Sequence, residues 1–339
     1  MKSGSNLERI LESGTFAVTC EIGPPTDANA EVVIGKARLL KGMADAFNIT
    51  DCQTAVVRLS SIASAIFCLR EGIEPVMQMV TRDRNRIAIQ ADILGAAAHG
   101  IKNCLCIAGD HQSFGAAGRL KGHPGAKNVY DIDSINLIAI LKRMRDEGLT
   151  EGGDEIEVRP KMFIGAAWTP MADPVDFRVI RLAKKVKAGA NFIQTQGVYD
   201  MEAFKDSMRQ ARERGLHEQT NILTGIIVPK NSIMLNYMAA NVAGVRVPPA
   251  LIKRMKAAED KAPKGDRKAK TALATEEAVK ITVELIHQAR EIPGVRGVHI
   301  QAIEWEKMVP EIVTKAGLLP RPILPPLPPE PAPEPKKEG

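Results

Sequence analysis

The chain has 339 residues, of which 45% are hydrophobic, so it is long enough to bury a large core in one or two domains. Its formal net charge is +6, but aromatic residues make up only 4% and the cations are spread along predicted helices, which argues against a nucleic-acid-binding protein and favours an anionic small ligand. Five cysteines without a C-x-x-C pair, no signal-peptide pattern and no apolar run of membrane-spanning length predict a cytoplasmic protein with neither disulfides nor a membrane span.

Short apolar segments bounded by turn residues alternate with amphipathic segments along the chain. The predicted strands cover residues 16–22, 46–51, 75–81, 104–110, 162–168, 192–198, 222–228 and 297–303. The predicted helices cover residues 31–41, 59–70, 86–99, 134–146, 174–188, 201–214, 232–241, 276–291 and 304–315. Eight strand-then-helix units predict a (β/α)8 barrel, and a doubly wound open sheet is the alternative.

Three segments fall outside this alternation. Residues 110–133 form a long glycine-containing loop, and long loops inside compact domains are usually functional. Residues 247–275 are predicted as an extra helix over 249–262 followed by a charged loop. Residues 320–339 are rich in proline and predict an extended or disordered tail, so that the barrel domain would cover residues 1–319.

The active site of a (β/α)8 barrel lies at the carboxyl ends of its strands, so the last residues of each predicted strand are the candidates for function. They are Glu21, Thr50, Asp51, Gln78, Asp110, Trp168, Gln196, Val228 and Gln301. Glu21 is a single carboxylate in an apolar run that stops at Gly23-Pro24-Pro25. Such a side chain either faces solvent or is kept for chemistry.

A metal site requires several converging His, Cys, Asp or Glu ligands. The predicted strand ends offer carboxylates but no histidine, while His111 and His123 lie in the long loop. A metal-dependent lyase or transferase therefore remains an alternative with weak support, and we expect no metal. Cys104 and Cys106 share one face of a strand, where buried small side chains are the expected explanation. The sequence contains neither a P-loop nor a strand-linked Gly-x-Gly-x-x-Gly motif.

Two further features fit a phosphate-bearing, flat ligand. In the turn Ile107-Ala-Gly-Asp-His111, Gly109 would allow close approach of the backbone to a ring, although the same turn could simply cap the strand. In the fifth helix, Arg178, Arg181 and Lys185 recur at spacings of three and four, which places them on one face that meets either phosphate or solvent.

Several stretches taken together resemble the methylenetetrahydrofolate reductase family from Leu7 to about Pro320. They are Thr19-Cys-Glu-Ile-Gly-Pro-Pro25, Ile107-Ala-Gly-Asp110, Ala188-Gly-Ala-Asn-Phe-Ile-Gln-Thr-Gln196, Gly225-Ile226 and Val245-Arg-Val-Pro248. The resemblance implies a (β/α)8 barrel and flavin-dependent reduction of 5,10-methylenetetrahydrofolate to 5-methyltetrahydrofolate. By position it implies that Glu21 is the general acid that opens the folate ring to an iminium. It also implies that Asp110 lies beside flavin and pterin and that Gln196 binds the pterin.

The resemblance further implies a flavin site, with FAD as the expected cofactor and FMN as the alternative. The implied contacts are Thr50, Gln78, Gly109, Asp110, Tyr130, Asp131, Ala166, Trp168, Arg181 and Lys185. Three positions depart from the family pattern: Gln78 replaces a common histidine, Ala108 an arginine, and Arg178 a frequent aspartate. These departures leave the flavin type open.

Ser232 stands about where NADH-using relatives carry a phenylalanine that stacks on nicotinamide. The resemblance therefore favours electrons from an iron–sulfur, zinc-containing partner subunit or a ferredoxin, with direct NAD(P)H as the alternative. We accordingly expect an oligomer or hetero-complex. A barrel that acts only as a scaffold in a redox complex is a further alternative.

Overall fold

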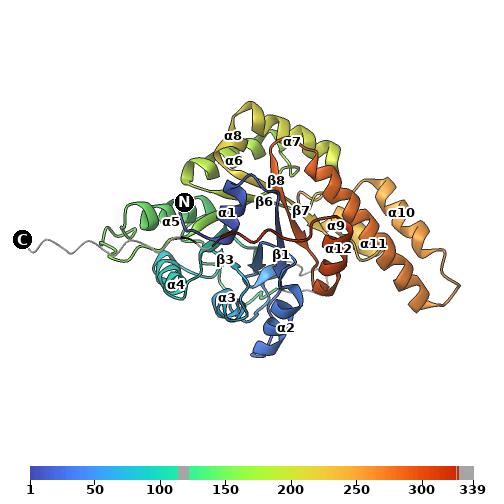
Figure 1. Cartoon of the computed structure of the whole chain (residues 1–339), viewed down its shortest axis with the longest axis horizontal. Helices are drawn as coiled ribbons and strands as arrows, with labels where there is room; N and C mark the ends of the chain where they lie inside the picture. The colour runs from blue at the N-terminus through green and yellow to red at the C-terminus, as the bar shows by residue number, and fades with distance from the viewer. Residues whose placement is uncertain (114–121, 326, 328–339) are drawn as a thin grey trace, which may run out of the picture.

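The structure is a computed structural model that describes residues 1–113, 122–325 and 327. Its eight strands pair in parallel and in chain order, and β8 pairs with β1 to close the barrel (Figure 1). The strands are β1 (Ala17–Ile22), β2 (Ala46–Ile49), β3 (Pro75–Val80), β4 (Asn103–Ile107), β5 (Phe163–Trp168), β6 (Phe192–Thr195), β7 (Asn221–Ile227) and β8 (Val295–Gln301). The predicted (β/α)8 barrel is confirmed.

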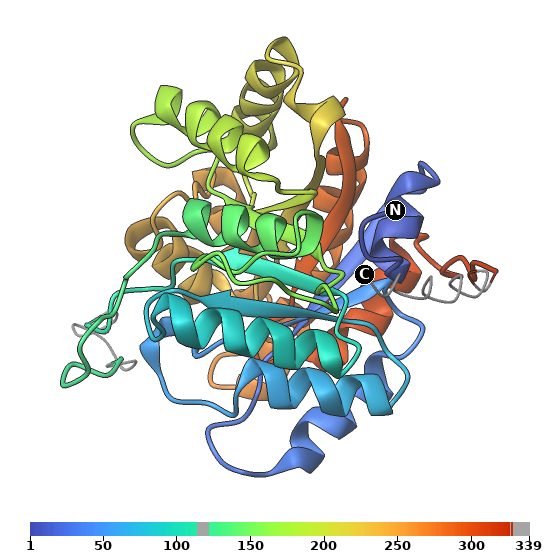
Figure 2. The same ribbon diagram turned by 90° about the vertical axis from the view of Figure 1, so that its left-hand side faces the viewer.

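Helices surround the barrel, and most lie where the amphipathic pattern places them (Figures 1 and 2). They are α1 (Asn6–Glu12), α2 (Ala30–Leu40), α3 (Ser61–Arg70), α4 (Arg86–Ala98), α5 (Ser134–Asp146), α6 (Val175–Ala188), α7 (Met201–Glu213), α8 (Leu216–Gln219), α9 (Ser232–Asn241), α10 (Pro249–Glu259), α11 (Arg267–Arg290) and α12 (Val309–Lys315). Two short 3-10 helices, η1 (Gln53–Ala55) and η2 (Glu306–Met308), follow β2 and β8.

The charged loop expected before residue 276 is wrong in its extent. Helix α11 already begins at Arg267, where Asp266 caps it by accepting the backbone N–H of Ala269 at 2.9 Å. Alanine, lysine and arginine dominate the added turns, and these residues have high helix propensity. The charge of this segment therefore belongs to a helix that packs beside α10.

Helix α1, which the sequence did not predict, closes the amino-terminal end of the barrel. Its Leu7, Ile10 and Leu11 are buried in one cluster with residues of the strand interior, including Phe163 and Phe192. The rings of these two phenylalanines stack with their centroids 5.2 Å apart. A second and larger cluster fills the layer between the strands and the surrounding helices. Because the lower barrel is filled with apolar side chains, polar chemistry is confined to its other end.

The first residues of the predicted tail lie against this closed end. Arg321 donates to both carboxylate oxygens of Asp45, at 2.9 and 2.6 Å, and to the backbone oxygen of Phe16 at 3.0 Å. Leu324 packs on the apolar cluster around α1. Residues 326 and 328–339 lie outside the described part of the chain, and the domain boundary after residue 319 stays a prediction.

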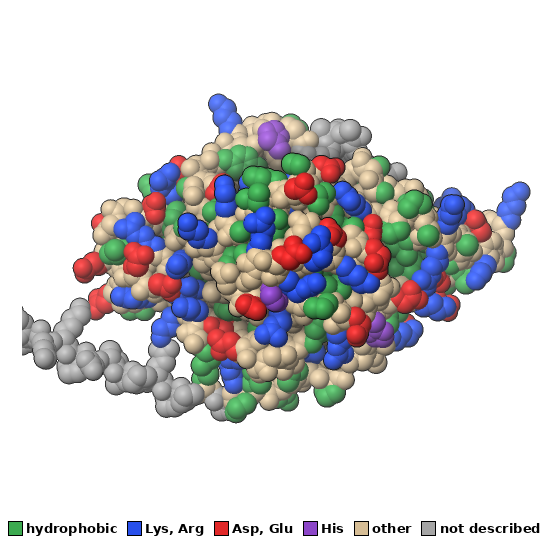
Figure 3. Space-filling view, turned by 90° about the horizontal axis from the view of Figure 1, so that it is seen from above, with side chains coloured by type: hydrophobic (Ala, Val, Ile, Leu, Met, Phe, Trp, Pro, Cys, Tyr) green, Lys and Arg blue, Asp and Glu red, His purple; other side chains and the backbone are tan. Residues whose placement is uncertain are grey.

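Positive and negative side chains are mixed over the face shown in Figure 3, without a large area of one sign. Among the described residues, no helix is both long enough and apolar enough to cross a membrane.

Candidate active site

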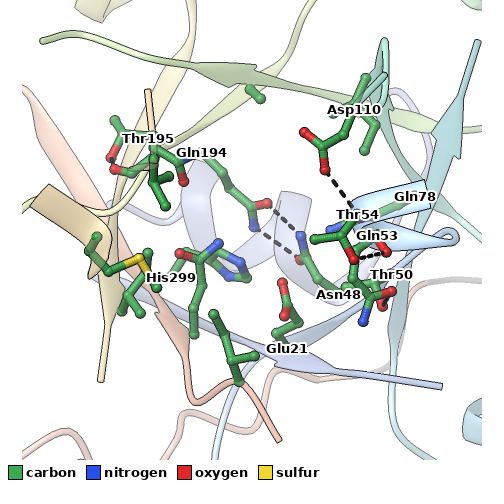
Figure 4. Close-up of a pocket in the computed structure, with 18 of the residues that line it drawn as sticks. Glu21, Asn48, Thr50, Gln53, Thr54, Gln78, Asp110, Gln194, Thr195 and His299 are labelled. Atoms are coloured by element: carbon green, nitrogen blue, oxygen red, sulfur yellow. Dashed lines mark hydrogen bonds between the residues drawn. The ribbon is translucent and has the colours of Figure 1, made fainter. Parts of the chain in front are cut away.

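A pocket of about 450 Å³ opens at the carboxyl ends of the strands (Figure 4). Six of the predicted strand-end residues line it: Glu21, Thr50, Gln78, Asp110, Gln196 and Gln301. Leu105, Ile107, Ala167 and Ile227 add apolar wall. The structure thus brings together residues from six different strands or the loops that follow them, as the barrel topology requires.

Glu21 projects into this pocket from the penultimate position of β1. Among the described residues, none donates a hydrogen bond to its carboxylate. Burial, together with the nearby Glu306, raises the pKa of Glu21 to about 7 against the opposing charges of Lys36 and Arg58. Near neutral pH a substantial fraction of this side chain is therefore a carboxylic acid able to donate a proton.

The floor of the pocket is a layer of polar side chains one step deeper in the barrel. Asn48 and Gln194 exchange two amide hydrogen bonds, at 2.6 and 3.0 Å (Figure 4). Gln194 also donates to the hydroxyl of Thr19 at 3.1 Å. That hydroxyl lies 3.0 Å from Nδ1 of His299. Burial lowers the pKa of His299 to about 3, so the imidazole is neutral.

Sequence reasoning missed this layer although a signal was present. Asn48, Gln194 and His299 each precede a predicted strand-end residue by two positions and therefore share its face. The pocket also contains a histidine, His299, that a search restricted to strand ends could not find.

Asp110 lies at the mouth, in the turn that follows β4. Its Oδ2 accepts a hydrogen bond from the backbone N–H of Thr54 at 3.1 Å (Figure 4). Its backbone oxygen accepts a hydrogen bond from Nη1 of Arg82 at 3.0 Å. Gly109 has φ +86°, and a Cβ atom there would lie 3.2 Å from side-chain atoms of both Val80 and Arg82. Glycine is therefore required at the turn that presents Asp110.

Two of the predicted cofactor contacts have side chains in the core rather than in the pocket. Ala166 and Trp168 are buried in the layer between β5 and the helices, where Nε1 of Trp168 donates to the Arg178 oxygen at 3.1 Å. Their neighbours Ala167 and Thr169 line the pocket instead. Successive side chains of a strand alternate between its faces, so the expectation that the Trp168 ring stands at the barrel mouth is wrong.

Asp51 and Val228 are two further predicted strand-end residues whose side chains lie outside the pocket. Asp51 accepts a hydrogen bond from Nη1 of Arg84 at 2.7 Å and another from the backbone N–H of Val80 at 3.1 Å. Its carboxylate therefore holds the end of β3 and the loop that follows. Val228 is buried in the core between strands and helices.

Tyr130 and Asp131 lie at the edge of the site rather than in the pocket. The hydroxyl of Tyr130 donates to the backbone oxygen of Gly109 at 3.2 Å, so the long loop returns to the turn that carries Asp110. Asp131 accepts two side-chain hydrogen bonds from Arg86, at 2.8 and 3.0 Å, and these lower its pKa to about 2. Residues 114–121 of this loop lie outside the described chain.

The cationic face of α6 is divided between structural and free groups. The ammonium group of Lys185 donates to the Ala167 backbone oxygen, and burial lowers its pKa to about 8 with a further contribution from Arg181. Arg178 donates to the Ala172 oxygen at 3.0 Å. Within the described chain the guanidinium of Arg181 has no hydrogen-bond or ion-pair partner, so it is the member of this set available to an anion.

Helix α9 forms one wall of the pocket through Met234, Tyr237 and Met238. Ser232 is buried and turned away from it, because its hydroxyl donates to Glu259 at 2.9 Å. The absence of an aromatic ring at position 232 therefore leaves the α9 wall to methionine and tyrosine side chains.

In the part of the chain that the structure describes, no three His, Cys, Asp or Glu side chains lie close enough together to hold a metal ion. Cys104 and Cys106 are buried against the helices, as expected for small core side chains.

Comparisons with known proteins agree with this geometry. The sequence matches the family described as methylenetetrahydrofolate reductase over residues 6–317. Among solved structures, the chain is similar to an uncharacterized protein from Clostridium thermocellum that is described as binding two copies of 5-methyl-5,6,7,8-tetrahydrofolic acid. The TM-score is 0.58 and the sequence identity 14%, and the match covers 93% of this chain and 99% of that one. DmoA from Hyphomicrobium sulfonivorans reaches a TM-score of 0.48 at 9% identity, covering 88% and 86%, a likeness too low to bear on function. At 14% identity the first likeness shows the shared fold, whereas the family match spans nearly the whole barrel. The chain belongs to the methylenetetrahydrofolate reductase family.

Proposed function

We propose that this protein reduces 5,10-methylenetetrahydrofolate to 5-methyltetrahydrofolate with a bound flavin. The observation that carries the proposal is Glu21, a carboxyl group with a pKa of about 7 that faces a pocket shared with Asp110 and Gln196. The solved relative described as binding 5-methyltetrahydrofolic acid supports a folate as the ligand.

Glu21 would donate its proton to the folate amine, and the carbon–nitrogen bond of the bridging methylene would then break to leave an iminium cation. Asp110 stands at the mouth and would favour this cation through its negative charge. Gln196 would orient the pterin through its side-chain amide, whose Oε1 also accepts the N–H of Gly197 at 3.1 Å. The apolar wall would limit the access of water to the iminium.

The described residues fit a flavin ring. The turn at Gly109 exposes backbone without a side chain, and Leu105, Ile107 and Ile227 offer a surface for a flat ring. Within the described structure, Oε1 of Gln301 is buried in the pocket wall with no hydrogen-bond partner, so it can accept an N–H from a bound ligand. Thr50, Gln78, Gly109 and Asp110 would hold the ring, which when reduced supplies the hydride for the methylene carbon. Arg181 would meet the phosphate arm of FAD or FMN.

For the electron source we favour an iron–sulfur partner subunit or a ferredoxin over NAD(P)H. The support is position 232 on α9, where NADH-using relatives carry a stacking phenylalanine and this chain has a serine whose hydroxyl donates to Glu259. A metal-dependent lyase and a scaffold without chemistry have no observation of comparable weight.

An absorption spectrum of protein purified from its native host tests the proposal. We expect a yellow protein that releases FAD or FMN on denaturation, bleaches with a chemical reductant and regains its colour when methylenetetrahydrofolate is added. Bleaching by reduced ferredoxin but not by NADH would support the proposed electron source. A colourless protein, or a bleached protein that methylenetetrahydrofolate does not reoxidise, would refute the proposal.

A further inference from the structure

The turn that follows β1 is held by two ion pairs whose members are far apart in sequence. Lys36 on α2 lies 2.5 Å from Oε1 of Glu306 on η2, and the side chain of Glu306 is only 7% exposed. Lys36 also donates to the backbone oxygen of Gly23 at 2.9 Å, and the N–H of Gly23 donates to Glu306 at 3.4 Å. The pair therefore binds both polar backbone groups of the residue two positions after Glu21.

The second ion pair differs from the first in its exposure to water. Arg58 donates to the Pro24 oxygen at 3.0 Å and lies 3.3 Å from Oε1 of Glu304. The side chain of Glu304 is 65% exposed, so solvent screens its charge. Both pairs hold the turn, but only the Glu306 pair places a shielded negative charge close to Glu21.

We propose that Glu306 and Lys36 are positioning residues for the proton donor Glu21: their shielded ion pair binds both backbone groups of Gly23 and so fixes the turn after β1 and the surroundings of the Glu21 carboxyl group. The inference rests on the proposed function, in which Glu21 must be protonated near neutral pH. Neither residue lines the pocket, so neither is assigned a contact with substrate.

The charges around Glu21 determine the direction in which each substitution should shift its ionisation. Glu306 opposes ionisation of Glu21, whereas Lys36 and Arg58 favour it. Of the other polar groups near the pocket, His299 in the floor is neutral, and Asp110 and Lys230 belong to other parts of the lining. Removing the charge of Glu306 alone leaves Lys36 unopposed and favours ionised Glu21. Removing both charges cancels these two opposite effects on the ionisation of Glu21.

The test is a pH titration of Glu21 itself, read from the carboxyl ¹³C resonance that disappears in Glu21→Gln. In Glu306→Gln we expect the titration midpoint to fall by about one pH unit. In the double variant Glu306→Gln with Lys36→Met we expect it to return toward the wild-type value. Glu304→Gln is the matched control, because its charge is exposed, and its midpoint should stay within a few tenths of a pH unit of wild type.

If the ion pair only held the turn in place, removing both partners would shift the titration midpoint of Glu21 further than Glu306→Gln alone does. An unchanged midpoint in Glu306→Gln, or a shift that the double variant enlarges, would overturn the proposal. If the double variant does not fold, Glu306→Gln and Glu304→Gln still decide the question. The titration needs neither flavin nor folate, so its outcome is independent of whether the protein proves to be a reductase.

Discussion

Asn48 on β2 and Gln194 on β6 face each other across the barrel interior, and each amide donates one hydrogen bond to the other. Both side chains are buried, so removing one leaves the other unsatisfied. We expect Gln194→Leu to lower the free energy of unfolding by about 1–3 kcal/mol, measured by urea denaturation. In the double variant with Asn48→Leu the loss should be less than the sum of the two single losses. Additive losses would mean that the two amides do not depend on each other.

Replacement of Glu21 by glutamine removes the only transferable proton of this side chain and keeps its size. We expect folate turnover to fall by about 10²–10⁴-fold while any bound flavin is retained, which absorption of the purified variant would show. Glu12→Gln, an exposed change on α1, is the control and should leave turnover unchanged. Substantial folate activity in Glu21→Gln would exclude the acid role.

The same side chain should make stability depend on pH. The pKa of Glu21 is about 7 in the folded protein against about 4.5 for an ordinary glutamate, so the folded state binds the proton more tightly than the unfolded state. Its contribution to stability is therefore present below about pH 4.5 and is lost as pH rises toward 7. Relative to wild type, Glu21→Gln should be more stable at pH 8 and show no such advantage at pH 4.5, measured by urea denaturation at both values. An equal difference at the two pH values would contradict this pKa.

Gly225 on β7 lies against the neighbouring strand. A Cβ atom there would be 2.1 Å from the backbone oxygen of Thr195, which cannot move without breaking the barrel. We expect Gly225→Ala to lower the free energy of unfolding by about 1–3 kcal/mol or more. Gly95→Ala on α4 is the matched control, because nothing lies within 4 Å of its added carbon, and it should stabilise the helix by up to about 1 kcal/mol.

Arg321 tests whether the start of the proline-rich segment belongs to the fold. The side chains of Arg321 and Asp45 are 10% and 1% exposed, and breaking such a buried pair costs about 3–5 kcal/mol. Arg321→Ala should therefore lower the thermal midpoint clearly. Arg38→Ala removes an ion pair whose arginine is 63% exposed and should cost no more than about 1 kcal/mol. Equal effects of the two variants would show that residues 320–325 add little to the barrel.

The sequence predicted the barrel well because its strands are short, apolar and regularly spaced. The same regularity placed Glu21, Asp110 and Gln196 at one end of the barrel, and in the structure all three line one pocket. Their roles toward folate and flavin stay predictions.

Side-chain direction was harder to predict, as Trp168 shows. The predicted strand ends at Trp168, as β5 does, but successive side chains face opposite sides, so Ala167 lines the pocket and the Trp168 ring lies in the core between strands and helices. The contacts of Glu306 with Lys36 could not be predicted at all, because 270 residues separate them and no local pattern connects them. The start of α11 was misjudged because its polar, charged turns resemble a loop in composition.

The contact between Arg321 and Asp45 joins positions 276 residues apart, and β1 finds its second neighbour only when β8 exists. A chain that grows from its amino terminus on the ribosome must therefore carry an unpaired β1 edge and an unpaired Asp45 until nearly all of it has been synthesised. Closure of the barrel is thus a late event in biosynthesis, and nascent chains that stall before residue 321 should be the ones that depend most on chaperones.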